Sequence, residues 1–470
     1  MARCLHPQSG PDTMNFRLPD LHAAYRSGSL TPLAVAEQCL AAAAAGDPAL
    51  FTTLLRERAL LEAQCSTLRW AQGRALGPLD GIPLVWKDLF DVAGTPTTAG
   101  SAWFADAPPA AADAPVVAAL ARAGAVAIGK VNLSEFAFSG LGLNRRYGNP
   151  VNPRARDVPR APGGSSSGSA SAVASGLVPI GMGSDTGGSL RIPAAFQGLV
   201  GYQPTATRHD RRHVYPLSST LDSVGPLAHT VQDCITVDAA LHGRAAWGDD
   251  AVAPAKASTL RFLVPTNVVF DDAEPEVRPA FDAAVEALSA AGAHIDDEPV
   301  PEFDAIAALT AKHGTLVAAE AYHWHQERVD GPHAGRFEPR VLARLQRGKT
   351  MSAHDLLTIQ ETRARLRASF EARLAGRVLL MPTAVHVAPE CAPLDASDEL
   401  FHRINALTLR NTSMGNLLGL CGMSLPIGTG RASMPLGAVL QCANGADETL
   451  FATALAVEKL WHPDRSSTTT

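Results

Sequence analysis

The stretch GGSSSGSASAVASGLVPIGMGSDTGGSLRIP, residues 163–193, joins two runs of small residues through a helix-then-strand pattern. The part SGSASAVASG predicts a helix that ends at Gly176, because glycine readily adopts the left-handed conformation that closes a helix. The apolar residues that follow, up to Gly183, predict a short strand. The two small-residue runs therefore border regular elements, and they are interpreted either as flexible linkers or as two halves of one site.

The same pattern continues outward along the chain. Thr31 and Pro32 predict a helix start, since a capping hydroxyl precedes a proline at the first helical position. Gly124 separates a predicted helix from a predicted strand. Helices that alternate with short apolar strands indicate an α/β fold, and no long linker divides the chain. The segments predicted to form these elements are 81–92, 115–131, 167–183, 275–296, 356–374 and 378–384.

Composition limits the class of protein. The chain has 470 residues, of which 46% are hydrophobic, so it can bury a large core. The net charge of −6 argues against a nucleic-acid partner. No apolar run is long enough for a signal peptide or a membrane span, so we expect a cytoplasmic protein without a membrane partner. Seven scattered cysteines predict free thiols, and residues 1–13 and 465–470 are expected to be flexible tails.

Residues 164–168 match G-x-S-x-G, which would make Ser166 a nucleophile on a strand-to-helix elbow. That elbow requires a strand directly before it. The preceding residues instead contain Pro150, Pro153, Pro159 and Pro162, and proline removes a donor from a sheet ladder. A phosphate-binding loop is excluded as well, because no Gly-Lys-Ser/Thr follows. An esterase that uses Ser166 is therefore the weakest alternative.

The run DTGGS ends in a serine after two glycines. Glycine lets a ligand approach the main chain, so consecutive amides here would suit an oxyanion hole with Ser189 as the nucleophile. A tight turn with a surface serine remains the alternative. The base would be Lys87, which lies among apolar residues, and burial lowers the pKa of a lysine. Alternatively, Lys87 is a strand-end residue that pairs with Asp88. The oxyanion-hole amides would be those of Thr186, Gly187, Gly188 and Ser189.

Residues 163–205 resemble the signature of the amidase signature family almost position by position. The resemblance extends over nearly the whole chain, in the order that the family shows. Its further blocks are GPLDGIPLVWKDLFDVAGTPTTAGS (77–101), GAVAIGKVNLSEFAFSG (124–140), YGNPVNP (147–153), PLSSTLDSVGPLAHTVQDC (216–234), VLLMPTA (378–384) and the segment 416–450.

The resemblance implies a single-domain α/β/α sandwich over residues 14–464, with a mixed twisted sheet among helices and a signature core at about 77–234. It implies a Ser–cis-Ser–Lys triad of Ser189, Ser165 and Lys87, with a cis peptide before Ser165. Asp185 and Arg191 would support the loop as a pair, although Arg191 is alternatively a binder of an acidic substrate. The residues expected to border the substrate are Ala137, Phe138, Ser139 and Gly140.

The implied reaction is hydrolysis of carboxylic amides, with esters, anilides and carbamates (urethanes) as further substrates and with no cofactor or metal. Two other family roles stay open: an amidotransferase subunit of the A type, which releases ammonia from glutamine beside partner proteins, and a non-catalytic family member. A homodimer stays open as well.

Two groups of histidines remain outside this scheme. A metal site at Glu320, His323 and His325 is disfavoured, because residues two apart on a helix do not share a face, and we expect a solvated helix face. The basic run HDRRH at 209–213 is expected to be solvated, with a contact to substrate as the alternative.

Overall fold

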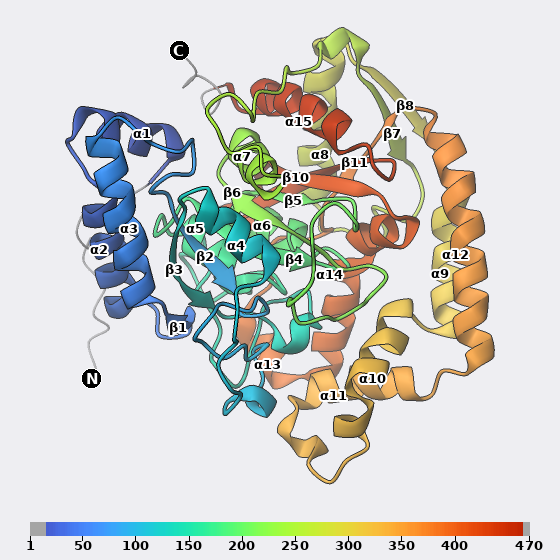
Figure 1. Cartoon of the computed structure of the whole chain (residues 1–470). Helices are drawn as coiled ribbons and strands as arrows, with labels where there is room; N and C mark the ends of the chain where they lie inside the picture. Colours follow the sequence, from blue (N-terminus) through green and yellow to red (C-terminus); the bar gives the residue numbers. More distant parts are fainter. Residues whose placement is uncertain (1–15, 464–470) are drawn as a thin grey trace, which may run out of the picture.

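The computed structural model describes residues 16–463, so the two predicted tails lie outside the described residues. One eleven-stranded sheet runs through the molecule in the order β1-β3-β2-β4-β6-β5-β10-β11-β9-β7-β8 (Figure 1). The strands are β1 (Phe51–Leu54), β2 (Pro83–Lys87), β3 (Val126–Val131), β4 (Ile180–Asp185), β5 (Val200–Gln203), β6 (Ser223–Ala228), β7 (Arg261–Pro265), β8 (His294–Glu298), β9 (Val378–Pro382), β10 (Cys421–Thr429) and β11 (Pro435–Cys442).

Helices surround this sheet. They are α1 (Leu18–Ser27), α2 (Pro32–Ala45), α3 (Arg56–Ala71), α4 (Pro115–Arg122), α5 (Ser167–Ala174), α6 (Arg191–Gln197), α7 (Val231–Leu241), α8 (Val277–Ala290), α9 (Pro301–His313), α10 (Leu316–Val329), α11 (Pro339–Lys349), α12 (Ala353–Leu374), α13 (Cys391–Ala396), α14 (Asp398–Leu418) and α15 (Asp447–Trp461). Helices α1 to α3 lie at the β1 end of the sheet, and α9 and α12 lie at the β8 end (Figure 1).

The sheet is mixed, which confirms the predicted fold class. β2 is parallel to both β3 and β4, and β7 is parallel to β8 and β9. The remaining neighbours pair antiparallel. Successive residues of a strand point to opposite faces of the sheet, and in β5 the two faces are covered by different helices. A Cβ at Gly201 would meet Ala194 of α6, whereas the ring of Tyr202 packs on Phe451 of α15.

The sequence patterns explain where the elements begin and end. Thr31 caps α2 by accepting a hydrogen bond from the amide of Ala34, as predicted. Gly124 and Gly176 follow helices with φ of +90° and +77°, the left-handed region that favours glycine. The helix predicted over 356–374 begins three residues earlier, at Ala353, because Ser352 forms a capping box with Asp355.

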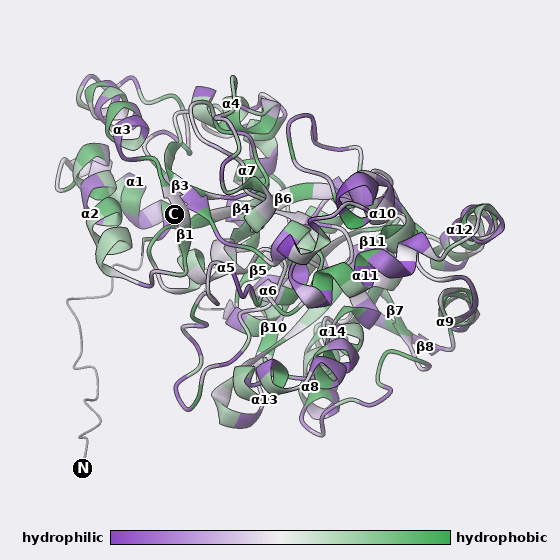
Figure 2. Ribbon diagram, turned by 90° about the horizontal axis from the view of Figure 1, so that it is seen from below, coloured by the Kyte–Doolittle hydropathy of each residue, from purple (hydrophilic) through white to green (hydrophobic). Residues whose placement is uncertain are grey.

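The central strands are buried because helices cover both faces of the sheet. Every residue of β2, β3 and β4 is buried, and apart from Lys87, Lys130 and Asp185 these central strands carry apolar or small side chains. The outer helices α11 and α12 instead alternate hydrophilic and hydrophobic residues along their length (Figure 2). Among residues 16–463, no helix combines the length and the apolar character that crossing a bilayer requires. The six described cysteines are free thiols, as expected, and Cys65 is the exposed one.

Glycine sets how closely α5 lies against the sheet. A Cβ at Gly181 of β4 would lie 2.6 Å from the carbonyl oxygen of Ser169 in α5. A Cβ at Gly168 of α5 would lie 2.6 Å from the carbonyl oxygen of Asn132. Both distances are shorter than a van der Waals contact, and the obstacle in each case is backbone. This close approach brings the segment before α5 to the end of β4.

We expect Gly181→Ala to destabilise the protein, since the added methyl group must push α5 off β4. Overpacking of this kind lowers the free energy of unfolding by roughly 1–3 kcal/mol. Urea unfolding followed by circular dichroism measures the change. Gly335→Ala is the matched control, because a Cβ there meets nothing within 4 Å. Equal stability of the two variants would contradict the role given to Gly181.

Candidate active site

The ends of two parallel strands place the central groups of the site. Lys87 is the last residue of β2, and Ser184 lies near the end of its parallel neighbour β4. Parallel strands present their carboxyl ends at the same sheet edge, where ligands bind in open α/β sheets. The segment that enters α5 crosses this edge and brings Ser165 and Ser166 beside Lys87. The two small-residue runs of the sequence therefore meet at one place.

Lys87 is fully buried, and its ammonium nitrogen is surrounded by hydroxyl groups. The distances from Nζ are 2.7 Å to Oγ of Ser165, 2.8 Å to Oγ of Ser184 and 3.1 Å to Oγ of Ser166. The alternative pairing of Lys87 with Asp88 is wrong, because Asp88 pairs with Lys130 at 2.6 Å. Lys87 thus has three hydroxyl partners and no direct carboxylate partner among residues 16–463.

Burial lowers the pKa of Lys87 to about 7, although Asp222 and Asp185 act in the opposite direction. A desolvated ammonium is unfavourable, and hydroxyl groups compensate for lost water less well than a carboxylate would. At neutral pH a large fraction of the amine is therefore uncharged. An uncharged amine can accept a proton from one of the neighbouring hydroxyl groups.

Ser165 follows a cis peptide bond from Gly164, as the family resemblance implied. Its carbonyl oxygen accepts from the amide of Ser134 at 3.2 Å, and the amide of the next residue, Ser166, donates to the carbonyl oxygen of Ser189 at 3.3 Å. The backbones of the two serine segments are therefore bonded to each other. No side-chain hydrogen bond joins Ser165 to Ser189 in the part of the chain that the structure describes.

Asp185 organises the turn that carries Ser189. It accepts from the amides of Gly188 at 2.8 Å and Leu190 at 3.0 Å, and from Arg191 at 2.9 and 3.1 Å. Burial alone would raise the pKa of Asp185, but the Arg191 guanidinium and these hydrogen bonds hold it below its ordinary value. Asn416 of α14 adds a further hydrogen bond at 2.9 Å. The Asp185–Arg191 pair expected from the sequence is present.

Three of the four predicted oxyanion-hole amides are available. The amide of Gly188 already donates to Asp185, so it is not free to bind an oxyanion. Gly188 is needed for another reason, since its φ is +127° and a Cβ would lie 2.2 Å from Oγ1 of Thr412. The amides of Thr186, Gly187 and Ser189 have no acceptor within residues 16–463. Such free donors beside a serine hydroxyl would suit the stabilisation of an oxyanion.

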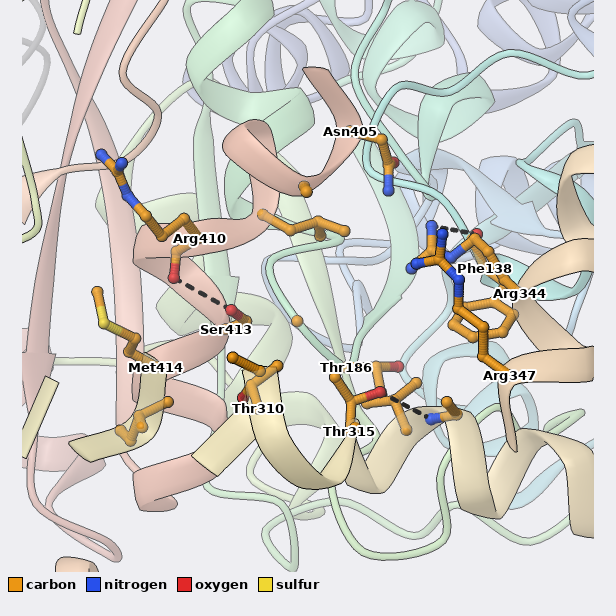
Figure 3. A pocket seen from close by; sticks show the side chains of 18 of the residues that line it. Phe138, Thr186, Thr310, Thr315, Arg344, Arg347, Asn405, Arg410, Ser413 and Met414 are labelled. Carbon is orange, nitrogen blue, oxygen red and sulfur yellow. Dashed lines mark hydrogen bonds between the residues drawn. The ribbon is translucent and has the colours of Figure 1, made fainter. Parts of the chain in front are cut away.

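A cavity of about 770 Å³ opens over this turn (Figure 3). Ala137, Phe138 and Ser139 line it together with Ser189, as the sequence predicted for the first three. Gly140 does not line it. Its amide donates to Oδ1 of Asn405 at 2.8 Å and its carbonyl oxygen accepts from Gly164, so its backbone is used for packing.

Much of the cavity wall lies on helices that carry no sequence motif. α14 supplies Asn405, whose Oδ1 also accepts from Ser139 at 3.0 Å. α11 supplies Arg344 and Arg347. No motif of the sequence points to α14 or to these individual residues. Only the pairing of distant segments in the fold brings these side chains to Ser189.

The remaining histidine groups differ from expectation. The solvated face predicted for Glu320, His323 and His325 is wrong for two of them. Glu320 accepts from Ser218 and Thr220, and His325 is 1% exposed with its ring 4.2 Å from that of Phe136. In α10 the packing against neighbouring loops overrides the polar pattern.

The basic run at 209–213 is only partly solvated. His209 is buried and lies 2.9 Å from Asp238. His209, Asp238 and His242 form the one group within residues 16–463 with metal-ligand spacing. Arg208 already donates twice to Asp238, which makes the carboxylate a poor ligand for a cation. We therefore assign no metal to it.

The chain is similar in sequence and in fold to known amidases and related enzymes. A family model described as Amidase matches residues 34–451. A 2-amino-5-chloromuconic acid deaminase of Comamonas testosteroni is 35% identical over 447 residues, which cover 93% of this chain and 95% of the relative. The A-type subunit of a glutamyl-tRNA(Gln) amidotransferase from Acidobacterium capsulatum is 32% identical over 94% of this chain and 98% of its own. A crystal structure of an amidase has a TM-score of 0.83 at 31% identity, over 94% of this chain and 99% of that chain.

We expect Arg191→Met to destabilise the protein strongly, because it leaves Asp185 buried without its cation. Breaking a buried ion pair on one side lowers the free energy of unfolding by about 3–5 kcal/mol. Urea unfolding measures this loss. Arg212→Met is the control, since the Arg212–Asp210 pair is exposed and its removal should leave the midpoint unchanged. Similar midpoints for both variants would show that the Asp185–Arg191 pair is dispensable.

Proposed function

The chain belongs to the amidase signature family of enzymes that act on the C–N bonds of amides, and we propose that it hydrolyses carboxylic amides through an acyl-enzyme on Ser189. One observation carries this proposal most directly. A fully buried lysine, Lys87, has its pKa lowered to about 7 by burial and donates to Oγ of Ser165 at 2.7 Å. Such a lysine suits the role of a general base.

In the proposed reaction, neutral Lys87 takes the proton of Ser165, which takes the proton of Ser189. Oγ of Ser189 attacks the carbonyl carbon, and the negative oxygen of the tetrahedral intermediate binds the free amides of the turn. The relay then returns one proton to the leaving nitrogen, the C–N bond breaks and the amine departs. Water attacks the acyl-enzyme by the same relay, releases the acid and restores Ser189.

The proposal requires the hydroxyl of Ser189 to reach Ser165 when substrate is bound. Catalytic hydrogen bonds are often long without substrate and tighten only in the reacting complex. The backbone hydrogen bond between Ser166 and Ser189 supports this step, because it keeps the two segments adjacent. Esters, anilides and carbamates (urethanes) would share the acylation step, so we propose them as additional substrates.

A second candidate is an amidotransferase component that releases ammonia from glutamine for a partner protein. The relative from Acidobacterium capsulatum, which matches 94% of this chain, favours it. The isolated protein distinguishes the two candidates. Turnover of amides other than glutamine without any added partner supports the amidase, whereas turnover restricted to glutamine supports the amidotransferase component. Either candidate is compatible with a homodimer.

We expect Ser189→Ala to lower kcat at least roughly ten-thousand-fold, since the nucleophile of a serine hydrolase has no substitute. Ammonia release from a panel of aryl, fatty and amino-acid amides measures the loss. A fluorophosphonate probe followed by peptide mass spectrometry should modify residue 189 in the parent protein. Modification at Ser166 would instead support the elbow alternative, and an unreactive protein would support a non-catalytic family member.

We expect kcat/KM to rise with pH through about pH 7. The neutral form of Lys87 is the base, and its fraction falls about tenfold for each pH unit below its pKa. A pH–rate profile on one good amide measures this limb. Lys87→Ala should also reduce amide hydrolysis more than ester hydrolysis, because a leaving amine needs the returned proton. A profile that is flat across neutral pH, or equal losses on both substrates, would contradict lysine as the base.

A further inference from the structure

The end of the cavity near Phe138 carries two arginines that the proposed chemistry does not use. Arg344 and Arg347 are three residues apart on α11, so they lie on the same side of the helix. Both line the cavity that contains Ser189. Figure 3 shows them next to each other, close to Phe138 and Asn405.

Neither arginine has an acidic partner within residues 16–463. Nη1 of Arg344 donates to the carbonyl oxygen of Phe138 at 2.8 Å, and its guanidinium lies 4.2 Å from the centre of the Phe138 ring. The side chain of Arg347 makes no hydrogen bond to a described residue. The carboxylate of Asp398 on α14 accepts from Arg340 at 2.7 Å.

Among the described residues that line the cavity, none is a free carboxylate that could balance the charges of Arg344 and Arg347. Asp355 is the one acidic residue among the described residues that line it, and it is bound to His313 at 2.8 Å and to Ser352. Arg344 therefore loses water without gaining a counter-charge. Burial lowers the pKa of Arg344 to about 10, and the charge of Arg347 contributes to this shift. The guanidinium group of Arg344 still stays charged at neutral pH.

Asn405 adds a neutral donor at the same end. Its Oδ1 accepts from the Gly140 amide and from Oγ of Ser139, so this oxygen is already bound by two donors of the protein. The amide nitrogen then points toward the arginines (Figure 3). His402 of α14 also lines this end. Burial lowers the pKa of His402, and Arg347 and Arg344 lower it further, so the ring is neutral and adds no charge.

We propose that Arg344 and Arg347 bind a carboxylate on the acyl part of the substrate while the amide lies at Ser189. The proposal rests on the proposed function, since it places the scissile bond at that serine. A guanidinium group matches a planar carboxylate through two parallel hydrogen bonds. A bound carboxylate would also relieve the repulsion between the two arginines. The preferred substrate is therefore the monoamide of a dicarboxylic acid.

Matched pairs of amides test this inference. Succinamic, glutaramic and adipamic acids are compared with butyramide, valeramide and hexanamide, which have the same chain lengths without the carboxylate. Ammonia release gives kcat/KM for each compound. We expect the parent protein to prefer the acid of at least one pair about tenfold or more, because charge-assisted hydrogen bonds are the strong ones. Equal kcat/KM in all three pairs would overturn the carboxylate site and leave the proposed hydrolysis intact.

Two substitutions locate the preference. Arg347→Gln should reduce the acid-to-neutral ratio about tenfold, and Arg347→Lys should retain part of it because the charge remains. Arg347 is exposed and makes no side-chain hydrogen bond to a described residue, so this variant should fold. Arg344→Gln should act in the same direction, with thermal unfolding as a check of its fold. Arg403→Gln is the matched control on α14, since it removes an exposed arginine that does not line the cavity. A ratio that is unchanged in both Arg344→Gln and Arg347→Gln would overturn the inference.

A binding measurement separates this inference from the proposed reaction. Calorimetry on Ser189→Ala compares glutaramic acid with valeramide without turnover. Tighter binding of the acid that is lost on adding Arg347→Gln supports the carboxylate site even if the parent protein releases no ammonia. Equal binding of the two compounds would overturn the site whatever the activity.

Discussion

The position of the turn that carries Ser189 depends on the buried carboxylate of Asp185. This carboxylate is fully buried at the end of β4, and it is bonded to the turn that follows, to Arg191 and to Asn416 of α14. A buried charge is tolerated only when it is paired and hydrogen-bonded, so the turn, α6 and α14 must keep their positions together. The conformation of the Ser189 turn is thus a consequence of satisfying one carboxylate.

Lys87, at the same sheet edge, is a second buried ionisable group, but it has no oppositely charged partner in contact. Lys87 receives hydroxyl groups instead of a carboxylate, while the neighbouring Asp88 is satisfied by Lys130. Two lysines within one sheet therefore have different environments. Burial lowers the pKa of both amines, but Asp88 opposes the shift at Lys130 through direct contact, whereas Lys87 has no carboxylate in contact and its pKa falls to about 7. The contrast explains how one strand end can hold an amine that exchanges protons near pH 7.

The sequence predicted local features well and distant ones poorly. Caps and glycine stops at Thr31, Gly124 and Gly176 depend on nearby residues, so they could be placed before the fold was known. The family resemblance places Gly140 beside the substrate, but its packing against α14 depends on a helix more than 250 residues away. The sequence predicts a solvated helix face at His325, yet its ring packs on Phe136. Long-range packing decided each of these cases, and no short motif encodes it.

The cavity has two kinds of wall with separate origins. Its floor comes from the turn with Thr186, Gly187 and Ser189, which lies next to the buried hydroxyl groups around Lys87 and leaves little tolerance for change. Its sides come from α9 to α11 and from α14. Under the proposed function, acyl-chain selectivity and bond cleavage are therefore set by different parts of the fold. New specificities can arise by drift in the helical walls while the chemistry beneath them is inherited unchanged.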